Sequence, residues 1–204
     1  ADGKTLAFVS TSRDHKHEWF RIADAASGAV RTVFEESVKT YYESGNDQVN
    51  WFYLPESHEA IWFSERTNWG QLYLYDLDTG KLKHAITSGE GNVTQVLKVD
   101  PKSRTLWFRG VGREHGVNPY YQQFYKVSLD AGKPTLLTPE ASDHTVALSP
   151  DGRLFVDAYS TPTTPPVTVL RNAQSGQVVA QVAKADISRL VASGWIAPTP
   201  FTVK

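Results

Sequence analysis

The chain has 204 residues, and its 21 Lys and Arg against 22 Asp and Glu give a formal net charge of −1. This balance argues against a nucleic-acid-binding protein and against a partner of anionic membranes, because both functions rely on an excess of basic residues. The absence of cysteine excludes disulfides, thiolate metal sites and a cysteine nucleophile, and no apolar run reaches the ~18 residues of a membrane-spanning helix.

Short apolar stretches alternate with polar turns along the chain, which favours strands over helices. A first unit is predicted to form strands at 5–10, 18–23 and 30–34. Three later units are each predicted to form four strands, at 49–54, 60–64, 71–76 and 81–85, then at 93–99, 105–109, 122–128 and 134–137, and then at 145–148, 154–158, 167–170 and 178–182.

Two of these strands carry apolar or aromatic side chains on successive residues. Residues 6–9 read Leu-Ala-Phe-Val, so this strand is expected to be buried on both faces. Residues 72–75 alternate Leu and Tyr, which sends large side chains to both faces of the strand. Such a pattern is typical of a strand that lies between two packed sheets.

Each unit contains a tight turn that begins at Asp or Asn and ends at Gly. The turns close at Gly28, Gly80, Gly132 and Gly176, with spacings of 52, 52 and 44 residues. A period of ~40–50 residues with several short strands per repeat is typical of β-propeller blades. The sequence therefore predicts an all-β fold, a β-propeller with about four blades of four antiparallel strands.

The first blade is expected to be incomplete, because residues 1–6 resemble the turn and strand start at 149–154 without a preceding strand. Blades are expected at about 1–36, 47–88, 92–138 and 143–183, which together form a propeller region over residues 1–184. Residues 185–192 carry the one clear helical periodicity. A short helix is therefore expected there, within a linker over 185–204.

Two predicted loops are long enough to carry a binding site. The loop at 35–48 contains Tyr41 and Tyr42, and the loop at 110–121 contains Arg113, Glu114 and His115. Long polar loops on a rigid scaffold often bind ligands. The alternative is that each loop serves only to connect strands.

His15, His17 and Glu18 are close enough in sequence to be considered as metal ligands. No further ligand is placed near them by its spacing, and Arg13 and Lys16 would repel a cation. A solvated hairpin tip is the alternative interpretation, and no metal is expected.

Motifs for catalysis and cofactor binding are absent from the sequence. No Gly-x-Ser-x-Gly segment occurs, so the nucleophile of an α/β-hydrolase is not expected within these residues. Phosphate-binding loops are also absent, and the glycine-rich turn at 89–91 contains Glu90, whose carboxylate opposes an anion. Neither a catalytic residue nor a cofactor is therefore expected.

Glu65 and Arg66 follow an apolar strand and precede the turn at 67–70. Adjacent opposite charges at a hairpin tip could contact a charged ligand. The alternative is an ion pair that orders the turn, with Trp69 packed on the blade edge.

The segment 61–76, IWFSERTNWGQLYLYD, resembles a propeller blade of dipeptidyl peptidase IV-type enzymes. Residues 149–152 and 135–138 resemble the final blades of the same family, and the segment from Ser193 to Lys204 resembles the stretch that leads into its hydrolase domain. The resemblance implies an eight-bladed propeller joined to an α/β-hydrolase domain, which together release dipeptides, typically X-Pro, from peptide N-termini.

The family's propeller also contributes a pair of glutamates that binds the free amine of the substrate. Glu35 and Glu36 stand in a different blade from that pair, so they are expected to be solvated charges. The loop that begins at Tyr41 falls where the family has a loop beside the second substrate pocket. Tyr41 and Tyr42, together with Glu65 and Arg66, are therefore the expected substrate-binding residues.

These expectations predict a non-catalytic propeller segment that admits and orients peptides for a separate hydrolase domain of the same chain. A protein-interaction scaffold without a link to catalysis is the alternative. The resemblance further implies a peptide substrate as partner, admits a homodimer, and favours a periplasmic or secreted protein, although the residues alone leave a cytoplasmic location open.

Overall fold

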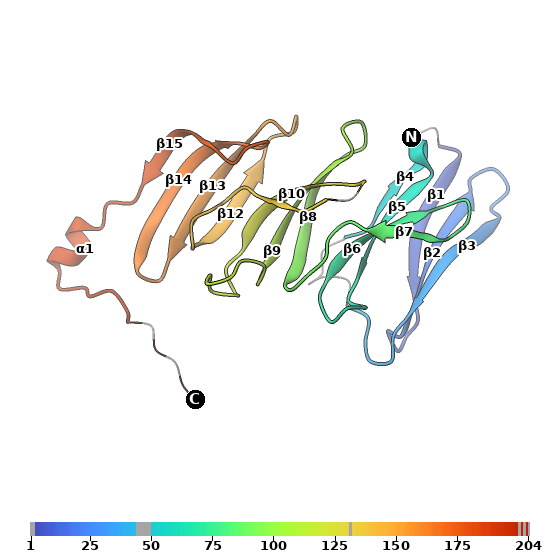
Figure 1. Cartoon of the computed structure of the whole chain (residues 1–204), viewed down its shortest axis with the longest axis horizontal. Coiled ribbons are helices and arrows are strands. Elements are labelled where there is room, and N and C mark those ends of the chain that lie inside the picture. Colours follow the sequence, from blue (N-terminus) through green and yellow to red (C-terminus); the bar gives the residue numbers. More distant parts are fainter. Residues whose placement is uncertain (1–2, 44–49, 131, 200, 202, 204) are drawn as a thin grey trace.

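A computed structural model describes residues 3–43, 50–130, 132–199, 201 and 203. Over these residues the chain forms four antiparallel sheets, each built from one continuous stretch of sequence (Figure 1). Sheet 1 consists of β1 (Thr5–Thr11), β2 (His17–Asp24) and β3 (Val30–Ser37). Sheet 2 consists of β4 (Phe52–Leu54), β5 (Glu59–Ser64), β6 (Gln71–Asp76) and β7 (Leu82–Ala85), with the 3₁₀ helix η1 (Pro55–Ser57) between β4 and β5.

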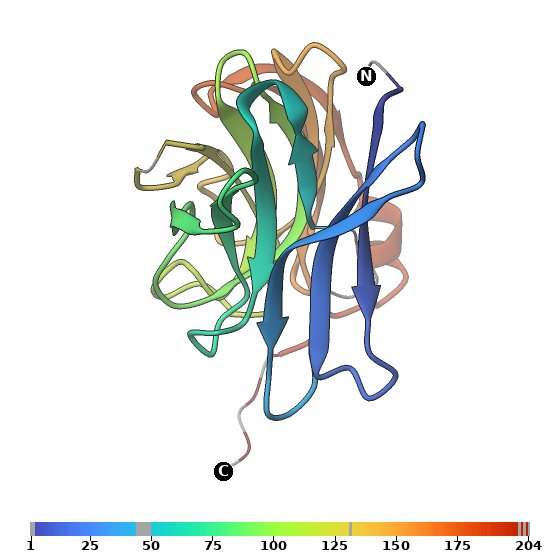
Figure 2. The ribbon, with the colours of Figure 1, turned by 90° about the vertical axis from the view of Figure 1, so that its right-hand side faces the viewer.

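The two remaining sheets repeat the same order of strands. Sheet 3 consists of β8 (Asn92–Asp100), β9 (Thr105–Val111), β10 (Gln123–Ser128) and β11 (Thr135–Leu136). Sheet 4 consists of β12 (Asp143–Leu148), β13 (Leu154–Thr161), β14 (Thr164–Asn172) and β15 (Val178–Lys184). In every sheet each strand pairs with the next one along the chain, and the sheets stack in sequence order (Figures 1 and 2). The prediction of an all-β propeller fold with an incomplete first blade is confirmed.

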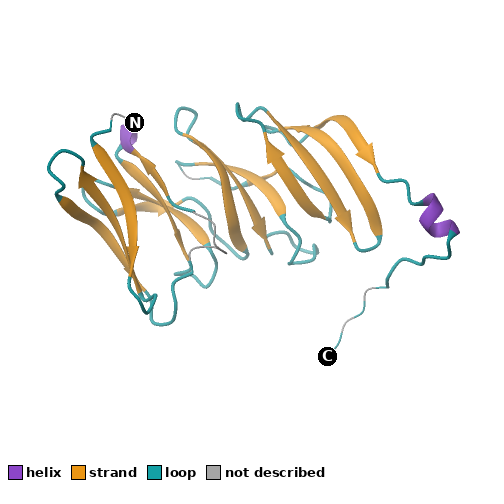
Figure 3. Ribbon diagram, turned by 180° about the vertical axis from the view of Figure 1, so that it is seen from behind, coloured by secondary structure: helices purple, strands orange, loops and turns teal. Residues whose placement is uncertain are grey.

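Helix is confined to η1 and to α1 (Ser188–Ala192) in the described residues, and α1 lies beyond β15 in the C-terminal segment (Figure 3). It is shorter than the predicted 185–192, and its apolar residues Leu190 and Val191 are exposed. Within the same residues, no helix has the length and apolar character needed to cross a membrane. The division into blades and a linker toward a hydrolase domain stays a prediction.

Strand β6 carries the alternation that the sequence predicted. Leu72 and Leu74 belong to the apolar cluster between sheets 2 and 3, whereas Tyr73 and Tyr75 belong to the cluster between sheets 1 and 2. The expectation for residues 6–9 is wrong, because Leu6 is 63% exposed and only one face of β1 packs on a neighbour. Sheet 1 stands at the end of the stack, so its other face meets no further sheet of the described residues (Figure 1).

One turn residue in each of sheets 2, 3 and 4 is bonded in the same way. The backbone N–H groups of Leu77, Leu129 and Ala173 each donate to the carbonyl of the residue that precedes the second strand of their own sheet. Their own carbonyls accept a side-chain hydrogen bond from the preceding sheet; the donors are Arg31 Nη2 (3.1 Å), His84 Nε2 (2.7 Å) and Trp107 Nε1 (3.0 Å), respectively. The turn therefore holds both its own sheet and the junction with the sheet before it.

Glycine is required where these turns touch the preceding sheet. Gly80 and Gly176 have φ of +69° and +75°. A Cβ at Gly80 would lie 2.2 Å from the Val33 carbonyl oxygen, and one at Gly176 would lie 2.6 Å from that of Leu137. No side chain fits at either place, which explains in packing terms why these turns end in Gly.

A glutamine and a threonine join the exit of one sheet to the entry of the next. In sheet 2 the Thr87 hydroxyl donates to Gln71 Oε1 (2.6 Å) and accepts the N–H of Leu72 (2.9 Å), while Gln71 Nε2 donates to the Gly91 carbonyl (2.9 Å). Sheet 3 repeats this arrangement with Thr138, Gln123, Phe124 and Ser142 in the corresponding places. These groups are buried, so each clamp satisfies polar atoms that would otherwise lack partners.

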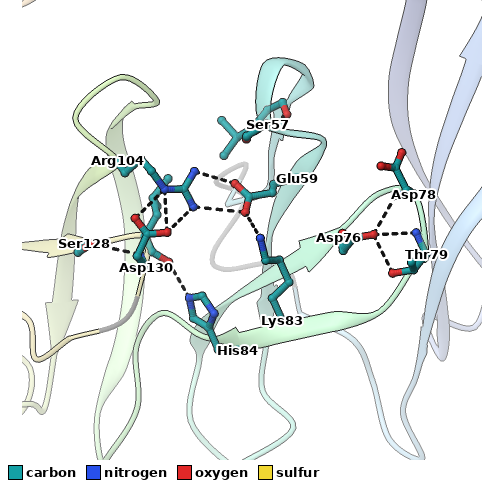
Figure 4. Close-up of polar contacts among 12 residues, drawn as sticks. Ser57, Glu59, Asp76, Asp78, Thr79, Lys83, His84, Arg104, Ser128 and Asp130 are labelled. Carbon is teal, nitrogen blue, oxygen red and sulfur yellow. Dashed lines mark hydrogen bonds and ion pairs between the residues drawn. The ribbon is translucent and has the colours of Figure 1, made fainter.

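Charged side chains join sheets 2 and 3 at the end opposite to the long loops. Arg104 lies between two carboxylates and donates to Glu59 (2.8 Å) and to Asp130 (2.7 Å), and Lys83 donates to Glu59 as well (2.5 Å) (Figure 4). Burial favours the neutral form of Glu59, but the bonds from Arg104 and Lys83 outweigh it and lower its pKa to about 2. Glu59 is therefore ionised throughout the physiological range.

Candidate functional site

The loops that the sequence singled out gather at one end of the sheets. In a four-stranded antiparallel meander, the connection between the second and third strands leaves from the same end as the connection to the next sheet. In Figure 1 these connections form the lower edge of the molecule, whereas η1 lies at the opposite end. The segments 38–43, 65–70 and 112–122 therefore lie along one edge although they are far apart in the sequence.

A cavity of about 250 Å³ lies at this edge, between the loop that follows β3 and the turn that follows β5. Three of the four residues predicted to bind substrate line it, namely Tyr41, Tyr42 and Glu65. The remaining lining residues are Val38, Thr40, Glu43 and Asn68. We call this space the tyrosine cavity; Arg66, the fourth predicted residue, is not part of its lining.

The two tyrosines differ in exposure and in partners. Tyr41 is 55% exposed and stacks on the His15 ring, with centroids 4.6 Å apart and planes inclined by 10°. Tyr42 is 5% exposed, and its hydroxyl donates to the Phe63 carbonyl. Burial and nearby carboxylates raise the pKa of Tyr42, so its phenol stays protonated. Tyr41 thus presents its ring to solvent, while Tyr42 anchors the wall of the cavity in the core.

Arg66 reaches into the junction between sheets 1 and 2. Its Nη2 donates to Glu36 Oε2 at 2.7 Å and to the Tyr75 hydroxyl at 2.9 Å. The guanidinium also lies 4.3 Å from the centroid of the Tyr73 ring, within range of a cation–π contact. Its ion-pair partner is therefore Glu36 of β3, rather than the adjacent Glu65.

The expectation that Glu35 and Glu36 are both solvated charges is wrong for Glu36. Glu35 is exposed and faces His17 Nδ1 at 2.9 Å. Glu36 is buried in the junction, where it accepts hydrogen bonds from Trp62 Nε1 at 2.6 Å, from the Ser64 hydroxyl and from Arg66. Consecutive residues of a strand face opposite sides, and only the inward carboxylate requires such compensation for its burial.

Carboxylates make the surroundings of the tyrosine cavity negative. Burial raises the pKa of Glu65, and the nearby charge of Glu43 raises it further. Burial also raises the pKa of Glu18, in part against the hydrogen bond from Thr11. Glu43, Glu65 and the Tyr41 ring line the cavity, so it can accept hydrogen bonds from ligand N–H groups and attract positive charge.

Glu43 and Asn68 line the cavity but were not among the predicted site residues. Asn68 has φ of +67°, a conformation that Asn tolerates better than most residues. The Asn-Trp-Gly turn at 68–70 was the available signal for that conformation. Nothing in the sequence indicated that this turn meets the loop after β3.

The three residues considered as metal ligands are not brought together. His17 Nδ1 faces Glu35 and Ser37, each at 2.9 Å, while His15 stacks on Tyr41 and Glu18 accepts from Thr11. Their side chains therefore bind three different sets of neighbours.

A different group has ligand atoms close enough for a metal ion in the described part of the chain: Glu140, His144 and Asp157. Arg171 already provides a cation there. Its Nε lies 2.8 Å from Asp157 Oδ2 and its Nη2 lies 2.7 Å from Glu140 Oε2. We interpret this group as a buried ion-pair network between sheets 3 and 4.

The second long loop borders a larger cavity at the same edge. Its volume is about 790 Å³, and Arg113, Glu114 and His115 are among its lining residues. We call it the Arg113 cavity. The turn at 88–90 and the segment 132–134 supply its other walls.

Comparison with known proteins places the chain in a family. Residues 1–166 match the model for the dipeptidyl peptidase IV (DPP IV) N-terminal region. Dipeptidyl peptidase 4 of Arthroderma otae is 35% identical over 104 residues, which are 50% of this chain and 13% of that protein. Dipeptidyl peptidase 4 of Trichophyton rubrum is 33% identical over the same length.

Solved structures agree with the observed fold. Porphyromonas gingivalis dipeptidyl peptidase 4 superposes with a TM-score of 0.76 at 20% identity, covering 93% of this chain and 26% of that one. A putative dipeptidyl aminopeptidase IV from Bacteroides ovatus gives 0.74 at 23% identity, covering 91% and 28%. The match to the family model extends over more than half of the chain, and we conclude that the chain belongs to the family of dipeptidyl peptidase IV N-terminal regions.

Proposed function

We propose that this chain is the non-catalytic β-propeller part of a dipeptidyl peptidase IV-like serine exopeptidase. It would admit peptides and orient them for a separate α/β-hydrolase domain that releases N-terminal X-Pro dipeptides. The observation that carries the proposal is the tyrosine cavity, where Tyr41 and Glu65 from two different sheets meet at the loop edge. Family membership supports the peptidase context over a scaffold without a link to catalysis.

The geometry suits recognition of an extended peptide. Tyr41 offers a partly exposed ring against which a flat side chain such as proline can pack. Glu65 offers a carboxylate for N–H groups or for a positive charge of the peptide. Tyr42 and Arg66 would act as positioning residues, because both are bonded within the junction between sheets 1 and 2.

The hydrogen bonds of the described residues also support a non-catalytic role. Ser37, His17 and Glu35 meet, as the members of a hydrolase triad do. However, the Ser37 hydroxyl and the Glu35 carboxylate face the same ring nitrogen, Nδ1. The imidazole of a catalytic triad uses one nitrogen for each partner, so this trio cannot relay a proton in that manner.

Cleavage and binding by the purified chain test the proposal. We expect no release of p-nitroaniline from Ala-Pro-p-nitroanilide, and weak saturable NMR shifts on addition of Ala-Pro-Ala. Glu65→Gln should weaken that binding about ten-fold through loss of a charge-assisted contact. Glu56→Gln, which changes an exposed carboxylate at the opposite end, is the matched control. Cleavage by the chain, or equal binding by Glu65→Gln and the control, would refute the proposal.

The proposal extends to partners and location. The hydrolase domain would belong to the same protein, whose active form would be a homodimer in the periplasm or outside the cell. Sedimentation of the complete enzyme tests the dimer, and cell fractionation tests the location. A monomeric active enzyme, or activity confined to the cytoplasm, would contradict these two points.

A further inference from the structure

The Arg113 cavity has no part in the function proposed above. It is about three times as large as the tyrosine cavity, at about 790 Å³ against about 250 Å³. This volume lies within the range of about 300–1,000 Å³ that small-molecule sites occupy. Its walls come from the turn at 88–90 in sheet 2 and from sheet 3, so it lies across the junction of two sheets.

Arg113 differs from three other arginines that join the sheets. Arg66, Arg104 and Arg171 each contact at least one carboxylate within 2.8 Å. The hydrogen bonds of Arg113 go to neutral oxygens: Nη2 donates to the Ser88 carbonyl at 2.9 Å, and Nη1 donates to Gln71 Oε1 at 3.2 Å and to the Gly91 carbonyl at 3.5 Å. No carboxylate in the described residues lies within ion-pair distance of its guanidinium.

One edge of this guanidinium is open to a ligand. The buried side-chain donors without a partner in the described part of the chain are Arg21 Nε and Arg109 Nε. Arg113 Nε also has no hydrogen-bond partner among the described residues, and unlike those two atoms it is not fully buried. The Nε–H and a terminal N–H of a guanidinium form the pair of donors that a carboxylate binds with both oxygens.

The position of Arg113 is held before any ligand arrives. Its guanidinium carbon lies 5.8 Å from the ring centroids of Phe108 and Tyr125. The neighbouring backbone is packed so closely that a Cβ at Gly91 would lie 2.6 Å from Gly112. A donor fixed in this way loses little side-chain entropy on binding.

The charges around the cavity decide which anion fits. Arg113 and Lys133 bring two positive charges, and Glu90 and Glu114 bring two negative charges, so the lining is neutral overall. Glu114 accepts a hydrogen bond from the Tyr125 hydroxyl, and Glu90 is exposed. A neutral lining disfavours multiply charged anions such as phosphates, but it tolerates one carboxylate at the open edge of Arg113.

We propose that the Arg113 cavity is a second binding site, which takes the carboxylate of a short peptide. Arg113 supplies the fork of donors, and Lys133, which has no hydrogen bond or ion pair among the described residues, supplies a further positive charge at the rim. The carboxylate can be the C-terminus of the peptide or an acidic side chain. Neither source depends on the tyrosine cavity or on the hydrolase domain.

Three peptides separate the two sources of carboxylate: Ala-Ala-Ala, its C-terminal amide, and the amide of Ala-Glu-Ala. Binding to the purified chain is followed by NMR shifts of the Arg113 Nε–H and by calorimetry. We expect Ala-Ala-Ala or the Ala-Glu-Ala amide to bind at least about ten-fold more tightly than the Ala-Ala-Ala amide, which lacks any carboxylate. Equal binding of all three peptides would overturn the proposal.

Variants test whether Arg113 is the group involved. We expect affinity to fall about ten-fold in Arg113→Gln, less in Arg113→Lys, which keeps the charge but loses the fork, and about two-fold in Lys133→Gln. Arg153→Gln, at an exposed arginine outside the cavity, is the control. Because Arg113 also bonds the Ser88 carbonyl, thermal unfolding of each variant is measured in parallel. If Arg113→Gln proves unstable, the affinity of Lys133→Gln tests the proposal in its place. Unchanged affinity in Lys133→Gln and Arg113→Lys, or an equal loss in Arg153→Gln, would contradict the assignment.

Discussion

Aliphatic and aromatic side chains fill the junction between sheets 2 and 3, whereas the junction between sheets 3 and 4 combines a smaller apolar cluster with a buried ion-pair network. The two junctions use corresponding positions. Phe108 lies in the second strand of sheet 3, four residues after Arg104, whose carbonyl accepts the turn N–H. Asp157 lies in the second strand of sheet 4, four residues after Arg153, whose carbonyl accepts the turn N–H of that sheet. Both side chains face the preceding sheet. Phe108 packs on Tyr125 there, while Asp157 contacts Arg171 and His144.

This comparison shows that the same backbone position accepts an aromatic ring or a buried carboxylate, provided that the neighbouring side chains differ accordingly. Asp157 is fully buried, and its carboxylate contacts Arg171 and His144. Arg171 in turn contacts a second carboxylate, that of Glu140. Sheets 2 and 3 also share an ion-pair network, but it lies at the rim around Glu59, where Arg104 and Lys83 remain partly exposed (Figure 4). The charges around Glu59 lie outside the apolar cluster of their junction, whereas Asp157 and Arg171 are buried beside the apolar cluster that sheets 3 and 4 share.

The largest effect is expected in the buried ion-pair network between sheets 3 and 4. Asp157→Ala would leave Arg171 and His144 buried without their shared carboxylate, so we expect a loss of about 3–5 kcal/mol in the free energy of unfolding. Urea titration measures this loss, with Asp186→Ala in the exposed C-terminal segment as control. A loss below about 1 kcal/mol would mean that the network contributes little to the junction.

A cavity made in the apolar cluster between sheets 2 and 3 is expected to lower the free energy of unfolding almost as much. Leu74 is fully buried in the cluster between sheets 2 and 3, and Leu74→Ala should cost about 3 kcal/mol. Leu82→Ala, at a side chain that is 44% exposed, is the control and should cost less than about 1 kcal/mol. If both variants unfold at the same urea concentration, the cluster is not the main stabilising element of this junction.

Acid should weaken the rim network of sheets 2 and 3. The pKa of Glu59 is lowered to about 2 from its usual 4.5, so its ionised form contributes stability above pH 4.5 that is lost as the pH falls toward 2. The contribution is at most about 3 kcal/mol. The difference in unfolding free energy between the natural chain and Glu59→Gln should therefore shrink below pH 4.5. A difference that stays constant from pH 7 to pH 3 would exclude this role of Glu59.

The smallest effect is expected where the two junctions are alike. Thr87→Val and Thr138→Val each remove a buried hydroxyl that accepts a backbone N–H, from Leu72 and Phe124 respectively. Both should cost about 1–2 kcal/mol, because one buried donor is left without an acceptor. Thermal and urea unfolding of the two variants should agree closely. A much larger loss at one site would show that the clamps depend on the chemistry of their junctions.

The all-β character and most strand positions could be predicted from the sequence, because both depend on local signals. Alternation in β6 and the Asp- or Asn-to-Gly turns mark where strands lie and where they reverse. The exposure of Leu6 could not be predicted in this way. It depends on whether a further sheet covers β1, and no local pattern contains that information.

The candidate site was only partly accessible to sequence reasoning. Tyr41, Tyr42 and Glu65 stood out as polar or aromatic residues on predicted loops, and they share one cavity. The ion pair of Arg66 with Glu36 was missed, since the two residues come from different sheets. Asp157 and Arg171 were not among the predicted residues, although a signal for them exists. Charged residues at inward positions of predicted strands must find partners of opposite charge.

By itself, then, the amino-acid sequence determined what lies within a few residues: the strands, the turns that end in Gly, and the repeat that links them. The tertiary structure alone decided which side chains meet across the junctions. Donors as different as Arg31, His84 and Trp107 bond the turn of the next sheet in the same way. Either an aromatic ring or an ion pair can occupy the same position in a junction, as Phe108 and Asp157 show. The physical reason is that apolar burial and hydrogen bonds between sheets stabilise contacts that exist only once the sheets have packed against one another.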